Sequence, residues 1–177
     1  TPEQNLARLA LVLPPAPKPV AVYRPVVVVQ GLAYVSGHGP VRTDGSLITG
    51  RVGAELDLAA GHAAARQVGL AILANLRAHF ASLDRVHRVI KLLGMVNSAP
   101  DFLDHPKVIN GCSDLLVNVF GDAGRHARSE SVQKTAQDGF GGEGHDRHEE
   151  QEQAEIAEQA HGRRPGLGRE DARRHCR

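Results

Sequence analysis

The chain has 177 residues and a formal net charge of +1, with 21 Lys and Arg against 20 Asp and Glu. It has no Trp, two Tyr and four Phe, so it offers neither the concentrated basic stripe nor the stacking rings typical of nucleic-acid binding. No apolar run approaches the ~20 residues that span a bilayer, and the cysteines, Cys112 and Cys176, have no metal-ligand spacing. We therefore expect a cytoplasmic protein with no metal, no nucleic-acid partner and no membrane partner.

The first elements expected along the chain are a short helix and a hairpin. Residues 5–13 predict the helix, which the proline-rich stretch 14–19 ends because proline lacks an N–H and favours extended backbone. Two apolar runs, residues 26–29 and 32–35, flank Gln30-Gly31 and predict a β-hairpin.

A long helix is expected next, over residues 58–82, after a possible short strand within residues 47–52. Asp57 is its expected N-cap, and apolar residues recur every three or four positions. Gly61 and Gly69 each cost about 1 kcal/mol relative to alanine in a helix, which indicates close approach to a sheet.

The following elements are a strand, a second helix and a shortened strand. Residues 86–96 form an apolar run typical of a strand. The second helix should begin near Pro106 and end at Gly121, with Cys112 on its apolar side as a small core residue. The last strand begins at His126, and we predict that it stops at Ser129.

Residues 130–177 differ in composition from all that precedes them. They contain eleven acidic and eight basic residues, and their large apolar side chains are only Val132, Phe140, Ile156 and Leu167. Burial of so little apolar surface cannot offset the entropy of ordering the chain. We predict a disordered charged tail, and therefore three parts: an extension over 1–19, a folded domain over 20–129 and the tail over 130–177.

Four motifs occur in a fixed order with the expected elements between them. They are Tyr23, the sequence YVSGHGP at 34–40, PKVING at 106–111 and RHARS at 125–129. Over residues 20–129 this set resembles the RidA/YjgF family of imine and enamine deaminases, which also carry endoribonuclease names. The resemblance implies an α+β fold like that of the small chorismate mutases, with a mixed sheet packed by two helices. It also implies a homotrimer with clefts between subunits and no cofactor.

The resemblance implies site residues as well. Tyr23 matches the family's active-site tyrosine, and Asn110 matches a helix asparagine that faces the cleft. Arg128 matches the arginine that holds the substrate carboxylate, a role that suits its planar fork of N–H donors. The cleft-lining residues would be Ser36 and Gly37, with His38 where relatives usually carry glutamine.

Each of these residues also has a purely structural interpretation. Tyr23 could cap the first strand, and the Ser36 hydroxyl could belong to a turn. Asn110 could bond its own helix backbone, and Arg128 could be a surface residue of its strand.

Glu130 is the candidate for a missing catalytic carboxylate. In relatives, a final strand of alternating Val/Ile and Glu supplies the carboxylate that activates water, and no such alternation follows Ser129 here. The stretch is either a natural extension or a gene read in a shifted frame. Glu130 should share a strand face with Arg128 and pair with it or with solvent.

Two functions remain open on this basis. The first is binding of small 2-imino or 2-keto acids, with an ancestral hydrolysis of reactive imines to keto acids and ammonia that is weak or absent here. The second is a non-catalytic metabolite-binding or regulatory trimer.

Overall fold

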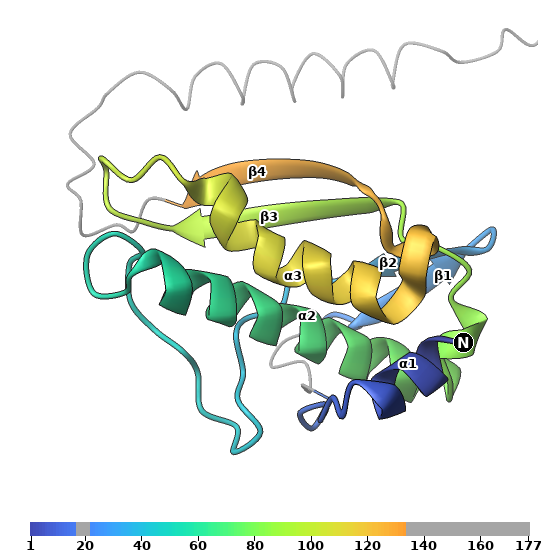
Figure 1. Ribbon diagram of the computed structural model, residues 1–177. Helices are drawn as coiled ribbons and strands as arrows, with labels where there is room; N and C mark the ends of the chain where they lie inside the picture. The colour runs from blue at the N-terminus through green and yellow to red at the C-terminus, as the bar shows by residue number, and fades with distance from the viewer. Residues whose placement is uncertain (17–21, 134–177) are drawn as a thin grey trace, which may run out of the picture. The chain divides into compact units, whose positions relative to one another are not determined.

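The computed structural model describes residues 1–16 and 22–133 (Figure 1). Apart from residues 130–133, the predicted tail lies outside the described residues. The elements are α1 (Pro2–Arg8), β1 (Val26–Val29), β2 (Leu32–Val35), α2 (Leu58–Phe80), β3 (Lys91–Asn97), α3 (His105–Phe120) and β4 (Ala127–Gln133), with short 3-10 helices at Leu83–Arg85 and Gly121–Gly124. This α+β content agrees with the predicted fold class.

Helix α1 begins earlier than predicted because a capping box closes its N-terminus. The amide of Gln4 donates to the Thr1 hydroxyl, and the Gln4 side chain accepts from the Thr1 amino group at 2.8 Å. Leu6 is buried in the core, and Nδ2 of Asn5 donates to the carbonyl of Val119 at 2.8 Å. The helix therefore packs against the C-terminal end of α3.

The predicted hairpin is confirmed. Strands β1 and β2 pair antiparallel from Val26–Val35 to Val29–Leu32. Gln30 and Gly31 both have positive φ, 51° and 78°, which is the backbone twist that joins two adjacent strands with the right hand. The short strand expected within residues 47–52 is reduced to isolated bridges, Val41–Leu47 and Val52–Ser98.

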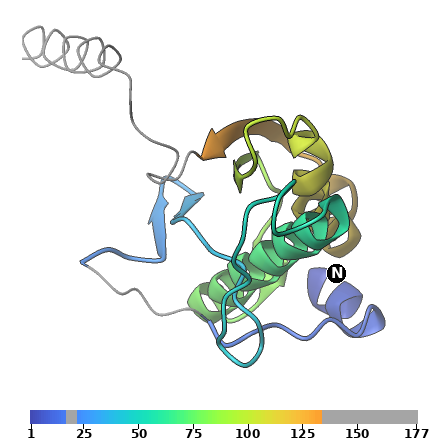
Figure 2. The ribbon, with the colours of Figure 1, turned by 90° about the vertical axis from the view of Figure 1, so that its left-hand side faces the viewer.

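The two long helices pack directly on each other, as Figures 1 and 2 show. The Asp57 side chain caps α2 by accepting from the Ala60 amide at 2.7 Å, as predicted. The prediction that both α2 glycines approach a sheet is wrong for Gly69, whose neighbours lie on α3. A Cβ on Gly61 would lie 2.9 Å from Val52, which bridges Ser98 beyond the end of β3. A Cβ on Gly69 would lie 2.8 Å from Cδ2 of Leu115, and a Cβ on Gly111 would meet the carbonyl of His62.

Strand β3 starts five residues later than predicted, at Lys91. A 3-10 turn capped by the Ser82 hydroxyl covers Leu83–Arg85, and the Val89 amide donates to the carbonyl of Ala123 at 2.8 Å outside any strand. Strand β4 continues to Gln133 rather than stopping at Ser129, and pairs parallel with β3 from Lys91–Ala127 to Asn97–Gln133. The backbone ladder with β3 supports residues 130–133 although their side chains lack an apolar pattern.

The expected mixed sheet is divided in this structure. The described strands form two separate two-stranded ladders, β1–β2 antiparallel and β3–β4 parallel. The core lies between the helices and one face of each ladder, and its largest fully buried side chains are Leu73, Leu83, Leu115 and Val119. Every described strand therefore has one edge without a ladder partner among the described residues.

Candidate functional site

Arg128 of β4 is held against the N-terminal half of α3. Its Nη1 donates to Oδ1 of Asn110 at 2.8 Å and to Oγ of Ser113 at 3.1 Å, and its Nη2 donates to the carbonyl of Pro106 at 3.4 Å. Pro106, Asn110 and Ser113 are spaced by four and three residues, so they lie on one face of the helix. The structure thus brings together the two predicted residues Arg128 and Asn110.

Glu130 lies on the same face of β4 and pairs with Arg128, as its spacing predicted. Nε of Arg128 lies 2.6 Å from Oε1 of Glu130, and both side chains are mostly covered, with exposures of 23% and 21%. A guanidinium has five N–H groups, and four of those of Arg128 face the partners just named. A ligand carboxylate that binds through two N–H groups must therefore displace at least one internal partner.

Ser113 and His126 belong to this cluster although the sequence-based site did not include them. Nε2 of His126 lies 3.2 Å from the Ser113 hydroxyl, and its Nδ1 lies 2.7 Å from the carbonyl of Gly124. In the sequence, Ser113 follows Asn110 by three residues on the helix and His126 precedes Arg128 by two, but these spacings do not show how α3 lies against β4.

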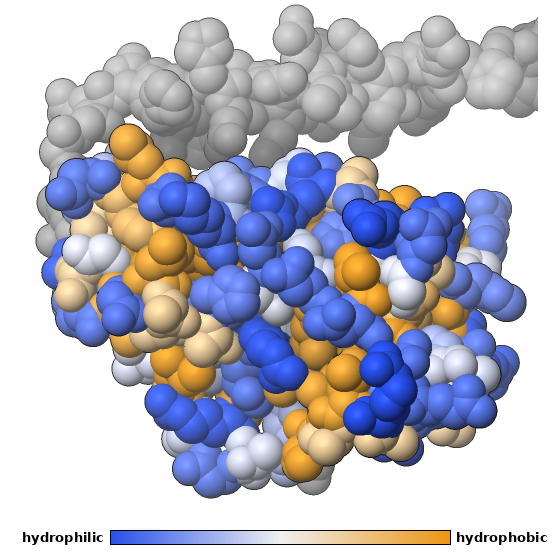
Figure 3. Space-filling model, in the orientation of Figure 1, coloured by the Kyte–Doolittle hydropathy of each residue, from blue (hydrophilic) through white to orange (hydrophobic). Residues whose placement is uncertain are grey.

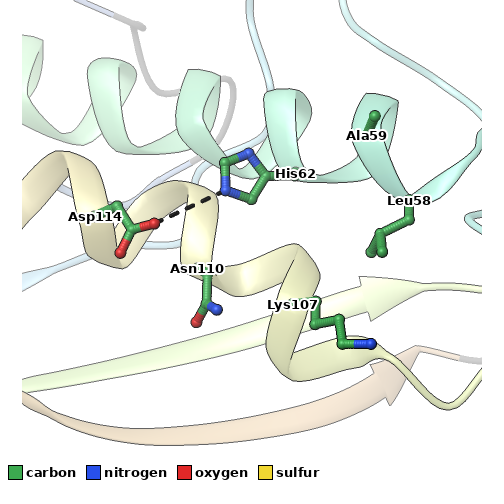
Figure 4. Close-up of a pocket in the computed structure, with 6 residues that line it drawn as sticks. All are labelled: Leu58, Ala59, His62, Lys107, Asn110 and Asp114. Atoms are coloured by element: carbon green, nitrogen blue, oxygen red, sulfur yellow. Dashed lines mark ion pairs between the residues drawn. The ribbon is translucent and has the colours of Figure 1, made fainter.

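A shallow groove between α2 and α3 borders the cluster (Figure 4). It has a volume of about 550 Å³ and is lined by Leu58, Ala59, His62, Lys107, Asn110 and Asp114. Nε2 of His62 and Oδ2 of Asp114 lie 4.0 Å apart across it. Because Asn110 both lines the groove and accepts from Arg128, the guanidinium lies beside this groove.

The remaining predicted residues form a second group around the hairpin. The Ser36 hydroxyl donates to the carbonyl of Arg24 at 2.7 Å, so it closes the base of the hairpin. Nδ1 of His38 lies 2.7 Å from the Ser36 carbonyl, and its Nε2 lies 2.6 Å from Nδ2 of the buried Asn75 on α2. Gly37 lies between them, where a Cβ would meet no atom within 4 Å.

Tyr23 precedes β1 and has 46% of its surface exposed. The hairpin group and the Arg128 cluster are far apart within one chain. Asn75 lies 13 residues beyond His62 on α2, which at a rise of ~1.5 Å per residue corresponds to ~20 Å. One chain thus holds two parts of the predicted site, and they do not meet within the described residues.

Cys112 occupies the core position that its helical spacing predicted. It is 4% exposed, and this burial raises the pKa of its thiol to about 11. The thiol is therefore protonated at neutral pH and is not a nucleophile.

The described residues contain no group of three or more His, Cys, Asp or Glu side chains placed to hold a metal ion. Within the same part of the chain, no helix has the length and apolar character needed to cross a bilayer.

Comparisons with known proteins agree with this fold. The sequence model of the family described as "YjgF/chorismate_mutase-like, putative endoribonuclease" matches residues 3–135. Protein TCP17 of Trypanosoma cruzi is 43% identical over 125 residues, which cover 70% of this chain and 78% of that protein.

Two solved structures are also similar. The protein Atu1372 of unknown function from Agrobacterium tumefaciens is 37% identical with a TM-score of 0.67, over 75% of this chain and 80% of that one. A protein described as a "putative endoribonuclease" from Shewanella oneidensis is 34% identical with a TM-score of 0.72, over 75% of this chain and 88% of that one. The chain belongs to the YjgF/chorismate mutase-like family.

Proposed function

We propose that this protein binds small 2-keto and 2-imino acids, with the ligand carboxylate on Arg128. The observation that carries the proposal is the placement of Arg128 beside Asn110 at the edge of the groove. A guanidinium makes two parallel charge-assisted bonds to a planar carboxylate. The side-chain amide of Asn110 can donate an N–H to the neighbouring C=O or C=N of the ligand.

The site is completed, in this proposal, by a neighbouring copy in a homotrimer. One chain separates Tyr23, Ser36, Gly37 and His38 from Arg128, so a second copy is needed to bring the two groups together. Exposed apolar side chains on the sheets support association. Tyr34 on β2 and Leu93 and Met95 on β3 are each about 60% exposed, at 60%, 60% and 59%, more than isolated ladders of this size should leave bare.

The ancestral reaction of such a site is hydrolysis of an imine to a keto acid and ammonia. A water molecule attacks the C=N carbon, and a carboxylate that removes its proton assists the attack. Glu130 is the carboxylate that pairs with Arg128, and Tyr23 of the adjacent copy would orient the substrate.

The contact between Glu130 and Arg128 favours a second candidate, binding without efficient catalysis. A carboxylate engaged at 2.6 Å by a guanidinium is a poor acceptor for a proton from water. A metabolite-binding or regulatory trimer would keep Arg128 and need no base.

The endoribonuclease descriptions of similar proteins do not lead us to propose an RNA substrate. Single-stranded RNA is bound by basic grooves with aromatic stacking platforms, and this chain has six aromatic Phe and Tyr side chains in all, two Tyr and four Phe. An RNA-cleavage assay on the same protein preparation tests the alternative activity directly.

Calorimetric titration of the full chain with pyruvate and 2-oxobutanoate tests the proposal. Arg128→Ala should weaken binding by about 10- to 150-fold, because a charge-assisted hydrogen bond contributes about 1.5–3 kcal/mol. Arg125→Ala is the matched control, since Arg125 is exposed and pairs with Asp122 at 3.4 Å instead. Equal affinity of the wild type and Arg128→Ala would show that Arg128 is not the carboxylate anchor.

A further inference from the structure

The ring of His126 is fixed in one tautomer by its surroundings. Its Nδ1 lies 2.7 Å from the backbone carbonyl of Gly124, which can only accept a hydrogen bond. Nδ1 must therefore carry the proton, and the neutral ring then presents Nε2 as an acceptor.

The carbonyl that sets this tautomer is itself held firmly. Gly124 is buried at the end of a 3-10 turn, where an added Cβ would lie 2.8 Å from Cα of Val117 on α3. The Ala127 amide, on the other side of His126, donates to the carbonyl of Ile90 at 3.0 Å. The imidazole is thus anchored to α3 through Gly124 and to the start of the β3–β4 ladder through Ala127.

Ser113 connects this ring to Arg128. Its hydroxyl lies 3.2 Å from Nε2 of His126 and 3.1 Å from Nη1 of Arg128. A guanidinium can only donate, and Nε2 of the neutral ring can only accept. The hydroxyl proton of Ser113 must therefore point to His126, which leaves the oxygen lone pairs for Arg128.

We propose that Ser113 and His126 are positioning residues that aim the guanidinium of Arg128. His126 draws the hydroxyl proton of Ser113 to its own side, and the Ser113 oxygen then holds Nη1 toward α3 and against the pull of Glu130 on Nε. This inference rests on the proposed function, because the guanidinium is aimed for a ligand carboxylate.

The test combines nuclear magnetic resonance of the ligand-free chain with pyruvate binding by calorimetry. At mildly alkaline pH, where an imidazole is neutral, the ring-nitrogen shifts of His126 should show a protonated Nδ1 and an accepting Nε2. Ser113→Ala should move the Nε2 signal and the Nε–H signal of Arg128. It should also weaken pyruvate binding by about two- to tenfold, which corresponds to the net contribution of one typical hydrogen bond.

Three further variants separate positioning from general damage. Ser113→Thr retains the hydroxyl and should restore the Arg128 signal and most of the affinity. His126→Gln should disturb the Arg128 signal in the same direction as Ser113→Ala. Ser129→Ala is the control, because its hydroxyl bonds Nζ of Lys91 at 2.6 Å on the opposite strand face and should leave both readouts unchanged.

The outcomes are distinct for the two proposals. A protonated Nε2 in His126, or an Arg128 signal and a pyruvate affinity unmoved in Ser113→Ala, would overturn the positioning role while leaving carboxylate binding intact. Absence of pyruvate binding in the wild type would instead overturn the proposed function. Even then the ligand-free spectra decide whether Ser113 and His126 hold Arg128.

Discussion

Nε of Arg128 lies 2.6 Å from Oε1 of Glu130, two residues further along β4. The chain therefore places its own carboxylate on the group that we propose for a ligand carboxylate. The same contact that keeps Glu130 close to the site also makes it a competitor there. Its effect on binding and its effect on catalysis have opposite signs, so they can be measured separately.

The binding effect is measured with Glu130→Gln. Loss of the negative charge should weaken the hold on Arg128 and tighten pyruvate binding by up to about fivefold, because an ion pair of this kind contributes up to ~1 kcal/mol. Glu55→Gln is a matched control, since Glu55 pairs with Arg51 at 3.0 Å on the surface. Calorimetry that finds weaker binding in Glu130→Gln would mean that Glu130 contacts the ligand rather than competing with it.

The catalytic effect is measured with 2-iminobutanoate generated in the assay. We expect little acceleration of keto-acid release by the wild type, because a positioned general base contributes ~10²- to 10⁴-fold and Glu130 is already engaged. If the wild type does accelerate the reaction, loss of that rate in Glu130→Gln assigns the base. Retention of the rate would direct the search to another group in the cleft.

The proposed trimer predicts a defined effect of charge on the exposed sheet face. Met95→Lys should shift the sedimentation coefficient of the chain from a trimer toward a monomer at micromolar concentration, because a buried unpaired ammonium is costly. Leu103→Lys is the control. Leu103 lies between β3 and α3 and is 83% exposed. Figure 3 shows that apolar side chains are exposed among hydrophilic ones on the face that it draws. A compact monomer in the wild type would remove the trimer from the proposal.

The contact between the helices predicts that Gly111 tolerates no side chain. A Cβ there would meet the backbone carbonyl of His62, which cannot move without shifting α2. Gly111→Ala should lower the free energy of unfolding by about 1–3 kcal/mol, although alanine alone favours a helix by ~1 kcal/mol over glycine. Urea unfolding measures this. Gly39→Ala, whose Cβ would lie 3.4 Å from a Leu47 side-chain atom, should change little.

Local signals predicted the elements whose boundaries are set by local chemistry. Asp57 fixes the start of α2 through one hydrogen bond to its own first turn, and Gln30-Gly31 fixes the hairpin register through positive φ. The predicted start of β3 was wrong because residues 86–90, with Val86, Val89 and Ile90, resemble a strand in composition. Only tertiary packing distinguishes such a stretch from a real strand. The predicted partner of Gly69 was also wrong, since a glycine shows that a close neighbour exists but not which element that neighbour belongs to.

The candidate site also has some residues that the sequence predicted and others that it did not. The two-residue period of a strand predicted that Arg128 and Glu130 share a face, and the family resemblance predicted that Asn110 is near. The involvement of Ser113 and His126 depends on how α3 lies against β4. No local pattern states that relation, so neither residue was found from the sequence.

The parallel pairing of β3 with β4 has a consequence for the order of folding. Val26 and Val35 of the hairpin are nine residues apart, whereas Lys91 and Ala127 are 36 apart with α3 between them. A hairpin closes in ~1–10 μs, but a ladder between distant segments forms only after the entropy of closing a long loop is overcome. We therefore expect the ability to bind a ligand to be the last property that the chain gains as it folds. Glu130 reaches Arg128 in the same step, because both residues lie on β4.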